Sequence, residues 1–333
     1  MKTRPLGQSG IEASVIGFGA WVTGGWMWGG ADDDESIAAI HAAIDHGITL
    51  IDTAPVYGYG HSEAVVGKAL RGKRDKVVLA TKCGLRWDMD PPQGVFHFAA
   101  DEKGFQQEDS PDAKYRIYKY NGPDGIKDEI EGSLTRLQTD HIDLYQTHWQ
   151  DETTPCEDTM ACLMQLKDEG KIRAIGVSNA TVDHVKAYQK AGPVDSMQEK
   201  YSMIDRGLEE ETLPFCAEQN IAVLAYSPLA NGLLTGRITP DRTFNEGDIR
   251  SWRPRFSVEN RKRVAKVLDL LKLIADNREI TLTQLVLAWT LQRPGLTHAL
   301  VGGRTAEQVA ENARAGEVTL STEELRGITE TLE

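Results

Sequence analysis

The feature of this sequence that most constrains its fold is a series of short β-branched runs separated by amphipathic stretches. Stretches with a helical spacing of apolar residues lie at 35–45, 62–70, 128–137 and 158–169. The β-branched runs lie at 13–17, 48–52, 77–82, 142–148, 172–178, 194–198, 221–227 and 299–302. Strands that alternate with helices form parallel sheets, and eight such strands predict an α/β fold, the closed (β/α)8 TIM barrel.

Three further segments complete the predicted architecture. Residues 4–10 carry two glycines around a turn and predict an N-terminal β-hairpin that would plug the lower end of the barrel. Two connections, 83–122 and 230–257, are far longer than the usual ~4–6 residues. Because they follow strands, we expect them on the catalytic face of the barrel. No internal repeat or Pro/Gly-rich linker divides the chain, so a single domain over 1–333 is predicted.

Charge and composition limit the partners that we expect. The 37 Lys and Arg against 50 Asp and Glu give a formal net charge of −13, which disfavours nucleic acid or an anionic membrane as partner. The start of the chain lacks the apolar core of a secretory signal, and no stretch reaches the ~20 apolar residues of a membrane span. We therefore expect a cytoplasmic protein with a small-molecule substrate; the sequence carries no signal of oligomeric state.

Several motifs of other protein classes begin in this chain but are not completed. The glycine spacing at 67–73 is that of a P-loop, yet Arg74 replaces the required Ser or Thr. Gly58 and Gly60 begin a dinucleotide fingerprint, but Glu63 stands at the third glycine. The four cysteines form no C-x-x-C pair and the histidines no H-E-x-x-H, so no metal site is predicted. The acidic run 32–35 is expected to cap a helix.

Ionisable residues end three successive predicted strands. Asp52, Lys82 and His148 stand at these ends, and Tyr57 follows Asp52 closely. The carboxyl ends of barrel strands converge on one rim, where this carboxylate, amine, imidazole and phenol would form a set suited to proton transfer. From spacing alone, an Asp52–Lys82 pair that merely stabilises the rim is an open alternative.

Six ordered motifs show a resemblance to a known family. They are GFGAW at 17–21, DTAPVYG at 52–58, ATK at 80–82, DLYQTHW at 143–149, GVSN at 176–179 and YSPLANGLLTG at 226–236. Over nearly its whole length the chain resembles the aldo-keto reductases. It looks most like the bacterial branch with general stress, inositol-catabolism and glycerol or glyceraldehyde oxidoreductases. The resemblance implies a (β/α)8 barrel that binds an extended nicotinamide cofactor without a Rossmann domain and reduces carbonyl groups.

The resemblance also implies a role for each of the four rim residues. Tyr57 is the general acid, Lys82 lowers its pKa, Asp52 pairs with Lys82, and His148 orients the carbonyl group. A free tyrosine has a pKa near ~10. A cation about 4 Å away at an effective dielectric of ~20 contributes about 4 kcal/mol, or at most ~3 pKa units. We therefore expect the pKa of Tyr57 to be lowered, although burial and Asp52 oppose this.

Cofactor residues are implied in the same way. Ser178, Asn179 and Gln198 would bind the nicotinamide carboxamide, and Tyr226 would stack on the ring. Arg304 and Gln308 would lie near an adenosine 2′-phosphate, in a glycine turn that opens a helix. The full expected set is Gly19, Ala20, Trp21, Asp52, Ser178, Asn179, Gln198, Tyr226, Ser227, Leu229, Gly232, Leu234, Gly302, Arg304, Gln308 and Asn312. Without the resemblance, Asn179 and Gln198 would be interpreted as turn residues, and an arginine at 304 that merely caps a loop is an open alternative.

The sequence as a whole predicts an NADP(H)-dependent oxidoreductase that reduces small aldehydes or ketones, reversibly. Gln308 stands where many animal members carry arginine, which weakens the expected preference for the phosphorylated cofactor. Two other functions stay open: a Schiff-base aldolase using Lys82, and a cofactor-binding regulatory subunit, for which no appended partner-binding segment is seen. The physiological substrate depends on the long loops. Expected pocket walls are Trp21, Trp26, Trp28, Trp87 and Trp149, each of which could equally be plain packing.

Overall fold

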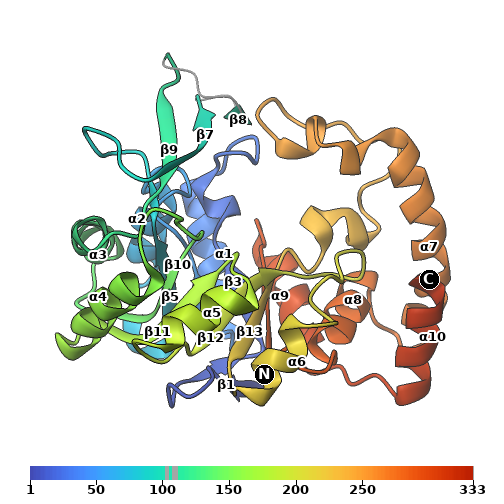
Figure 1. The fold of residues 1–333 in the computed structure, drawn as a ribbon. Helices are drawn as coiled ribbons and strands as arrows, with labels where there is room; N and C mark the ends of the chain where they lie inside the picture. The colour runs from blue at the N-terminus through green and yellow to red at the C-terminus, as the bar shows by residue number, and fades with distance from the viewer. Residues whose placement is uncertain (102–104, 107–111, 333) are drawn as a thin grey trace.

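Eight parallel strands close into a barrel in the computed structural model, which describes the chain except residues 102–104, 107–111 and 333 (Figure 1). The strands pair in the order β10-β11-β12-β13-β14-β3-β4-β5, and β5 pairs with β10 to complete the ring. Their bounds are β3 (Ile16–Gly19), β4 (Leu50–Asp52), β5 (Val78–Cys83), β10 (Ile142–Thr147), β11 (Ile172–Ser178), β12 (Ser196–Lys200), β13 (Ala222–Tyr226) and β14 (His298–Val301). The predicted (β/α)8 barrel is confirmed.

Helices cover the outside of the barrel (Figure 1). The first begins as predicted, because the Asp32 carboxylate accepts a hydrogen bond from the backbone N–H of Glu35 and caps the helix. Apolar faces of these helices and the outward side chains of the strands form one large buried core. The helices are α1 (Asp33–Asp45), α2 (His61–Ala69), α3 (Pro123–Leu137), α4 (Cys156–Asp168), α5 (Val182–Gln189), α6 (Thr212–Glu218), α7 (Val258–Asn277), α8 (Leu282–Leu291), α9 (Ala306–Ala315) and α10 (Thr322–Leu332).

The predicted N-terminal hairpin is present and closes the lower end of the barrel. It consists of β1 (Thr3–Pro5) and β2 (Glu12–Ser14), paired antiparallel. Leu6, Ile11 and Ala13 are buried in a core separate from the main one, together with inward-facing barrel residues such as Leu50 and Leu144. The predicted run 13–17 therefore spans two elements, the end of β2 and the start of β3.

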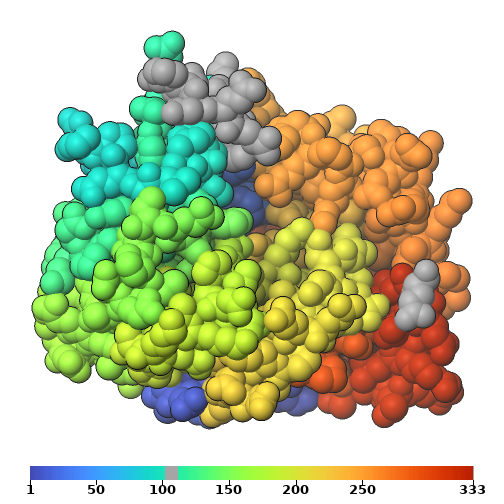
Figure 2. All heavy atoms as spheres, viewed as in Figure 1, coloured from blue at the N-terminus to red at the C-terminus, as the bar shows by residue number. Residues whose placement is uncertain are grey.

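The two long connections lie on the opposite face, where the barrel strands end. The first contains a four-stranded antiparallel sheet that the sequence did not predict, with β6 (Leu85–Arg86), β7 (Val95–Ala100), β8 (Phe105–Gln106) and β9 (Tyr115–Lys119). The second contains three short 3-10 segments: Ala230–Thr235, Ile249–Ser251 and Pro254–Phe256. In the space-filling view the inserted sheet (cyan to green) and the second connection (orange) both rise at the top of the molecule (Figure 2). None of the helices described by the structure is long and apolar enough to cross a bilayer.

Candidate active site

One continuous cavity of about 690 Å³ opens between the strand ends and the two long connections. Its floor is formed where the barrel strands finish: Gly19 ends β3, Asp52 ends β4, Ser178 ends β11 and Tyr226 ends β13. Parallel pairing keeps these ends level, since Asp52 is in register with Gly19 on one side and with Ala80 on the other. The barrel thus delivers polar groups from distant parts of the chain to one place, as predicted.

Asp52, Tyr57, Lys82 and His148 meet at the base of this cavity. The Lys82 ammonium donates to Asp52 Oδ1 at 2.6 Å, to the Thr53 carbonyl at 2.9 Å and to the Tyr57 hydroxyl at 3.4 Å. Lys82 is fully buried beneath the floor, whereas Tyr57 and His148 face the cavity. Their rings meet edge to face, with centroids 5.6 Å apart.

A dense hydrogen-bond network fixes the Asp52 carboxylate. Besides Lys82 on Oδ1, the side-chain amides of Gln198 and Gln146 donate to Oδ2 at 2.9 and 3.2 Å. Three donors on one buried carboxylate hold Asp52 and its neighbours in place. Gln146 was missed by sequence reasoning, although it lies two residues before His148 and therefore on the same face of the strand.

The electrostatics of Tyr57 differ from the expectation. Burial raises the pKa of Tyr57 well above its usual value, and the negative charge of Asp52 raises it further. The predicted lowering by Lys82 is wrong for this structure because Asp52 lies closer to the ammonium than the phenol does and neutralises its effect. Burial lowers the pKa of Lys82, and burial together with the Lys82 charge lowers the pKa of His148 well below its usual value. Tyr57 is therefore protonated and His148 neutral at neutral pH.

The backbone around Tyr57 is held by a close approach between two glycines. A side chain on Gly24 would lie 2.7 Å from the Tyr57 carbonyl oxygen, and one on Gly58 would lie 2.5 Å from the Gly24 carbonyl oxygen. Gly58 also has φ of +67°, which other residues rarely adopt. Only glycine at both positions lets the 22–24 turn pack against the turn that carries Tyr57.

Asn179 links the strand ends on the other side of the cavity. Its side-chain amide donates to the His148 carbonyl at 2.9 Å, and its Oδ1 accepts from the Tyr226 hydroxyl at 2.8 Å. Ser178 in turn donates to the Gln198 carbonyl at 2.8 Å. These amides and the Tyr226 ring line the cavity together, so the structure brings together the residues predicted to bind a carboxamide and an aromatic ring.

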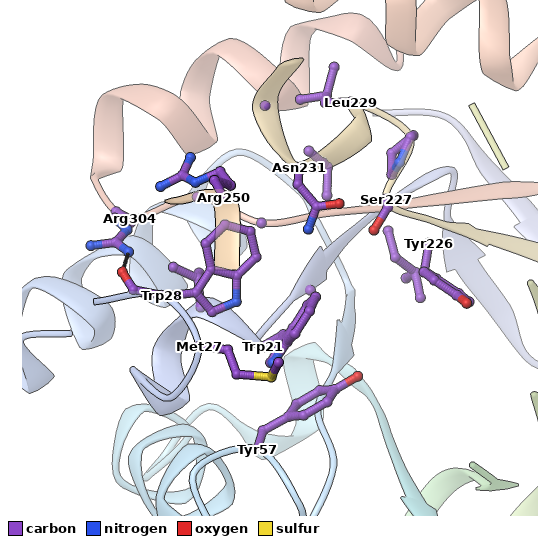
Figure 3. Close-up of a pocket in the computed structure, with 18 of the residues that line it drawn as sticks. Trp21, Met27, Trp28, Tyr57, Tyr226, Ser227, Leu229, Asn231, Arg250 and Arg304 are labelled. Atoms are coloured by element: carbon purple, nitrogen blue, oxygen red, sulfur yellow. Dashed lines mark hydrogen bonds between the residues drawn. The ribbon is translucent and has the colours of Figure 1, made fainter. Parts of the chain in front are cut away.

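The far end of the cavity is rich in arginine. Arg304 donates to the Trp28 carbonyl (Figure 3). The side chain of Gln308 accepts from the Arg304 backbone N–H at 2.9 Å. Arg250 lies over the Trp28 ring at 5.1 Å and is held by Asp248. Arg304 directly precedes the first turn of α9 and Arg250 lines the same cavity, a combination that suits a phosphate group. Arg250 was not predicted; it lies in the connection after β13, where sequence periodicity gives no guide.

Two segments join across this end of the cavity. Asp248 forms an isolated β-bridge with Trp28, and the N–H of Ile249 donates to the Met27 carbonyl at 3.0 Å. One segment follows β3 and the other follows β13, and β14 lies between these strands in the barrel. Together they form a bridge, residues 27–28 with 248–249, over the part of the cavity lined by Gly302 and Arg304.

Most predicted site residues lie on the cavity wall, and four do not; one of these is Lys82, which lies beneath the floor. Ala20 is buried and continues the strand pairing, since its N–H donates to the Asp52 carbonyl. Trp87 packs edge to face on Tyr59, and Leu234 lies in the main hydrophobic core. On the wall are Gly19, Trp21, Asp52, Tyr57, His148, Ser178, Asn179, Gln198, Tyr226, Ser227, Leu229, Gly232, Gly302, Arg304, Gln308 and Asn312, with Trp26, Trp28 and Trp149. No cluster of three metal-ligating side chains occurs among the described residues.

Comparisons with known proteins give a consistent result. The model of the Aldo/keto reductase family matches residues 15–333. The chain is 38% identical to aldo-keto reductase YhdN of Bacillus subtilis, over 100% of this chain and 94% of that protein. It is 40% identical to the NADH-specific methylglyoxal reductase of Escherichia coli, over 96% and 95% of the two chains.

Solved structures agree. A glycerol dehydrogenase from Gluconobacter oxydans superposes with a TM-score of 0.85 at 36% identity, over 99% of this chain and 94% of that chain. An aldo/keto reductase from Klebsiella pneumoniae, solved with NADP and acetate, gives a TM-score of 0.71 at 30% identity, over 99% and 95%.

Proposed function

Because the chain belongs to the aldo/keto reductase family, we propose that it acts as a single domain to reduce small aldehydes or ketones to alcohols, with Tyr57 as the proton donor and NADPH as the preferred cofactor. The observation that carries this proposal is the contact of a protonated, cavity-facing phenol with a buried Lys82–Asp52 pair. Its neighbour on the cavity wall is the neutral imidazole of His148.

Tyr57, Lys82 and His148 have different roles in the proposed reaction. A bound nicotinamide would supply the hydride to the carbonyl carbon. The Tyr57 hydroxyl gives its proton to the carbonyl oxygen, and Lys82 stabilises the phenolate that remains until a proton returns from solvent. His148 donates a hydrogen bond that orients the carbonyl oxygen. In the reverse direction the phenolate accepts the alcohol proton, so oxidation requires deprotonated Tyr57.

The cavity wall fits an extended nicotinamide dinucleotide. Ser178, Asn179 and Gln198 offer amide and hydroxyl groups to a carboxamide, and the Tyr226 ring lies beside them. At the other end Arg304 and Arg250 would hold phosphate groups. Such a cofactor has a nicotinamide ring, a carboxamide group and phosphate groups. The Tyr226 ring, the amide cluster and the arginine-rich end of the cavity match these three parts in turn.

A panel of small carbonyl compounds, followed by cofactor absorbance with NADPH and NADH in parallel, tests the proposed activity. We expect turnover of short aldehydes or ketones by the purified protein. Tight cofactor binding without turnover of any compound would instead support a regulatory subunit. A Schiff-base aldolase would be trapped on Lys82 by borohydride; the three hydrogen-bond acceptors around that ammonium disfavour this reaction.

The preference between cofactors is the finer part of the proposal. One relative is named NADH-specific and one similar structure contains NADP. We therefore infer the cofactor preference of this chain from its own residues. A charge-assisted hydrogen bond from Arg304 contributes about 1.5–3 kcal/mol, or roughly 10- to 150-fold in affinity. We expect Arg304→Ala to weaken NADPH by about that factor and leave NADH nearly unchanged in fluorescence titrations. Equal losses for both would show that Arg304 only anchors the Trp28 loop.

A further inference from the structure

Strand β7 of the inserted sheet contains a β-bulge at the cavity. Phe96 is in register with Tyr118, whereas Phe98 is in register with the very next residue of β9, Ile117. His97 is therefore the extra residue. In a regular strand neighbouring side chains point to opposite faces, but here both His97 and Phe98 line the cavity. Bulges often occur beside active sites, where they redirect a side chain.

The redirected imidazole is neutral and packs between two aromatic rings. Burial, with the nearby Lys119 charge, lowers the pKa of His97 to about 4. Its ring packs against Trp149 and Phe98, with centroids 4.8 and 5.1 Å apart. Among the described residues none forms a hydrogen bond with either ring nitrogen. A neutral imidazole carries one N–H donor and one nitrogen acceptor, and the residue that carries them lines the cavity.

The rest of this wall is apolar. Trp26 and Phe98 stack with centroids 5.8 Å apart, and Leu85 lies beside them on the lining. The imidazole also lies close to His148, since its ring packs on Trp149, the residue that follows His148. A polar group in such a wall costs free energy unless a ligand satisfies it. The position next to His148 therefore suits an oxygen atom attached close to the reacting carbonyl.

We propose that His97 binds a second oxygen of the substrate, so that the preferred substrates are short carbonyl compounds with a hydroxyl or second carbonyl group next to the reacting carbon. This inference rests on the proposed function, because it assumes that the carbonyl oxygen lies between Tyr57 and His148. His97 then determines specificity without taking part in proton transfer. Its neutral state lets it donate to a carbonyl oxygen or accept from a hydroxyl.

Hydroxyacetone and butanone test this directly, because they differ only by a hydroxyl in place of a methyl group. We expect the wild type to have a higher kcat/KM for hydroxyacetone. His97→Phe should reduce that ratio by roughly 2- to 12-fold, the loss expected for one neutral hydrogen bond. Most of this loss should come from hydroxyacetone, with butanone nearly unchanged. His97→Gln keeps a donor and an acceptor and should restore part of the ratio.

Phe96→Leu is the matched control, because Phe96 lies on the same strand, packs on Tyr118 and is off the cavity wall. It should leave the ratio unchanged. A purely structural role for His97 would lower both ketones equally in His97→Phe, and that result, or a wild type without preference, overturns the inference. Failure of the wild type to reduce either ketone or any aldehyde overturns the proposed function itself, and the inference with it.

Discussion

At the scale of single residues, the high pKa of Tyr57 determines which step the phenol performs readily. A group that keeps its proton across the neutral range is ready to act as an acid and must first lose that proton to act as a base. Reduction is therefore the easier direction at neutral pH. Oxidation of an alcohol should rise with pH, because the phenolate fraction rises.

Tyr57→Phe removes the proton donor and keeps the ring. We expect turnover to fall by about 100-fold or more, while cofactor affinity stays within a few-fold, because the ring still fills its place. Steady-state kinetics and fluorescence titration measure the two effects. Tyr59→Phe is the control, since Tyr59 stacks on Tyr115 and lies off the cavity wall. Near-wild-type turnover in Tyr57→Phe would exclude Tyr57 from the reaction.

Lys82→Met should abolish turnover, because the developing phenolate loses its cation. It also leaves the Asp52 carboxylate buried without an ion pair, which costs about 3–5 kcal/mol of stability. The double variant Lys82→Met with Asp52→Asn should recover much of this stability and none of the turnover. Thermal unfolding and kinetics separate the two effects. If Lys82→Met retained most of the activity, the pair would be purely structural.

The accuracy of prediction varied from residue to residue for physical reasons. Asp52, Lys82 and His148 could be placed from sequence because strand ends in a barrel must converge. The direction of the Tyr57 pKa could not, because it depends on how deeply the phenol is buried and on how near the Asp52 charge lies. His97 was missed because a bulge breaks the alternation on which strand patterns rely.

At the scale of elements, the barrel strands and their order were predictable because each is a local run with a strong apolar pattern. The inserted sheet was not, because β6 pairs with β9 across more than two dozen intervening residues and its strands carry few local signals. The same connection includes Pro91, Pro92 and Gly94, which are typical of a loop. The pairing of the strands in the inserted sheet depends on tertiary contacts, which the spacing of apolar residues in the sequence does not reveal.

The hairpin plug allows a prediction at this scale. Leu6 is fully buried among barrel-interior side chains, so Leu6→Ala should destabilise the fold by about 2–5 kcal/mol through lost burial and a new cavity. Turnover at low temperature should be unchanged, because the plug lies at the opposite end from Tyr57. Denaturant unfolding and kinetics measure both. A stability loss below about 0.5 kcal/mol would show that the plug is dispensable.

At the scale of the whole molecule, buried ionisable groups make stability depend on pH. Burial raises the pKa of Glu129 and of Glu199 from 4.5 to about 8. Between these values the unfolded chain releases protons that the folded protein keeps, so stability falls as pH rises, by up to about 1.4 kcal/mol per pH unit for each group. Burial lowers the pKa of His97 and His298 to about 4 and that of His148 well below its usual value, so these three groups make stability rise with pH up to about pH 7.

We therefore expect the melting temperature to fall as pH rises from about 7 to 8, because the two carboxyl groups outweigh the three histidines there. Calorimetry across this range measures the effect. The double variant Glu129→Gln with Glu199→Gln should flatten the dependence, because neither amide titrates. A melting temperature that rises through this window in the wild type would contradict the assignment.

The bridge between residues 27–28 and 248–249 has a kinetic consequence. A dinucleotide bound beneath it would be retained until backbone hydrogen bonds open, whereas a small carbonyl compound would leave without opening them. The two ligands would then have very different residence times. The parting of two loops, and not the breaking of a C–H bond, would then limit the rate of each cycle. Isotopic substitution of the transferred hydride would therefore leave the overall rate almost unaltered.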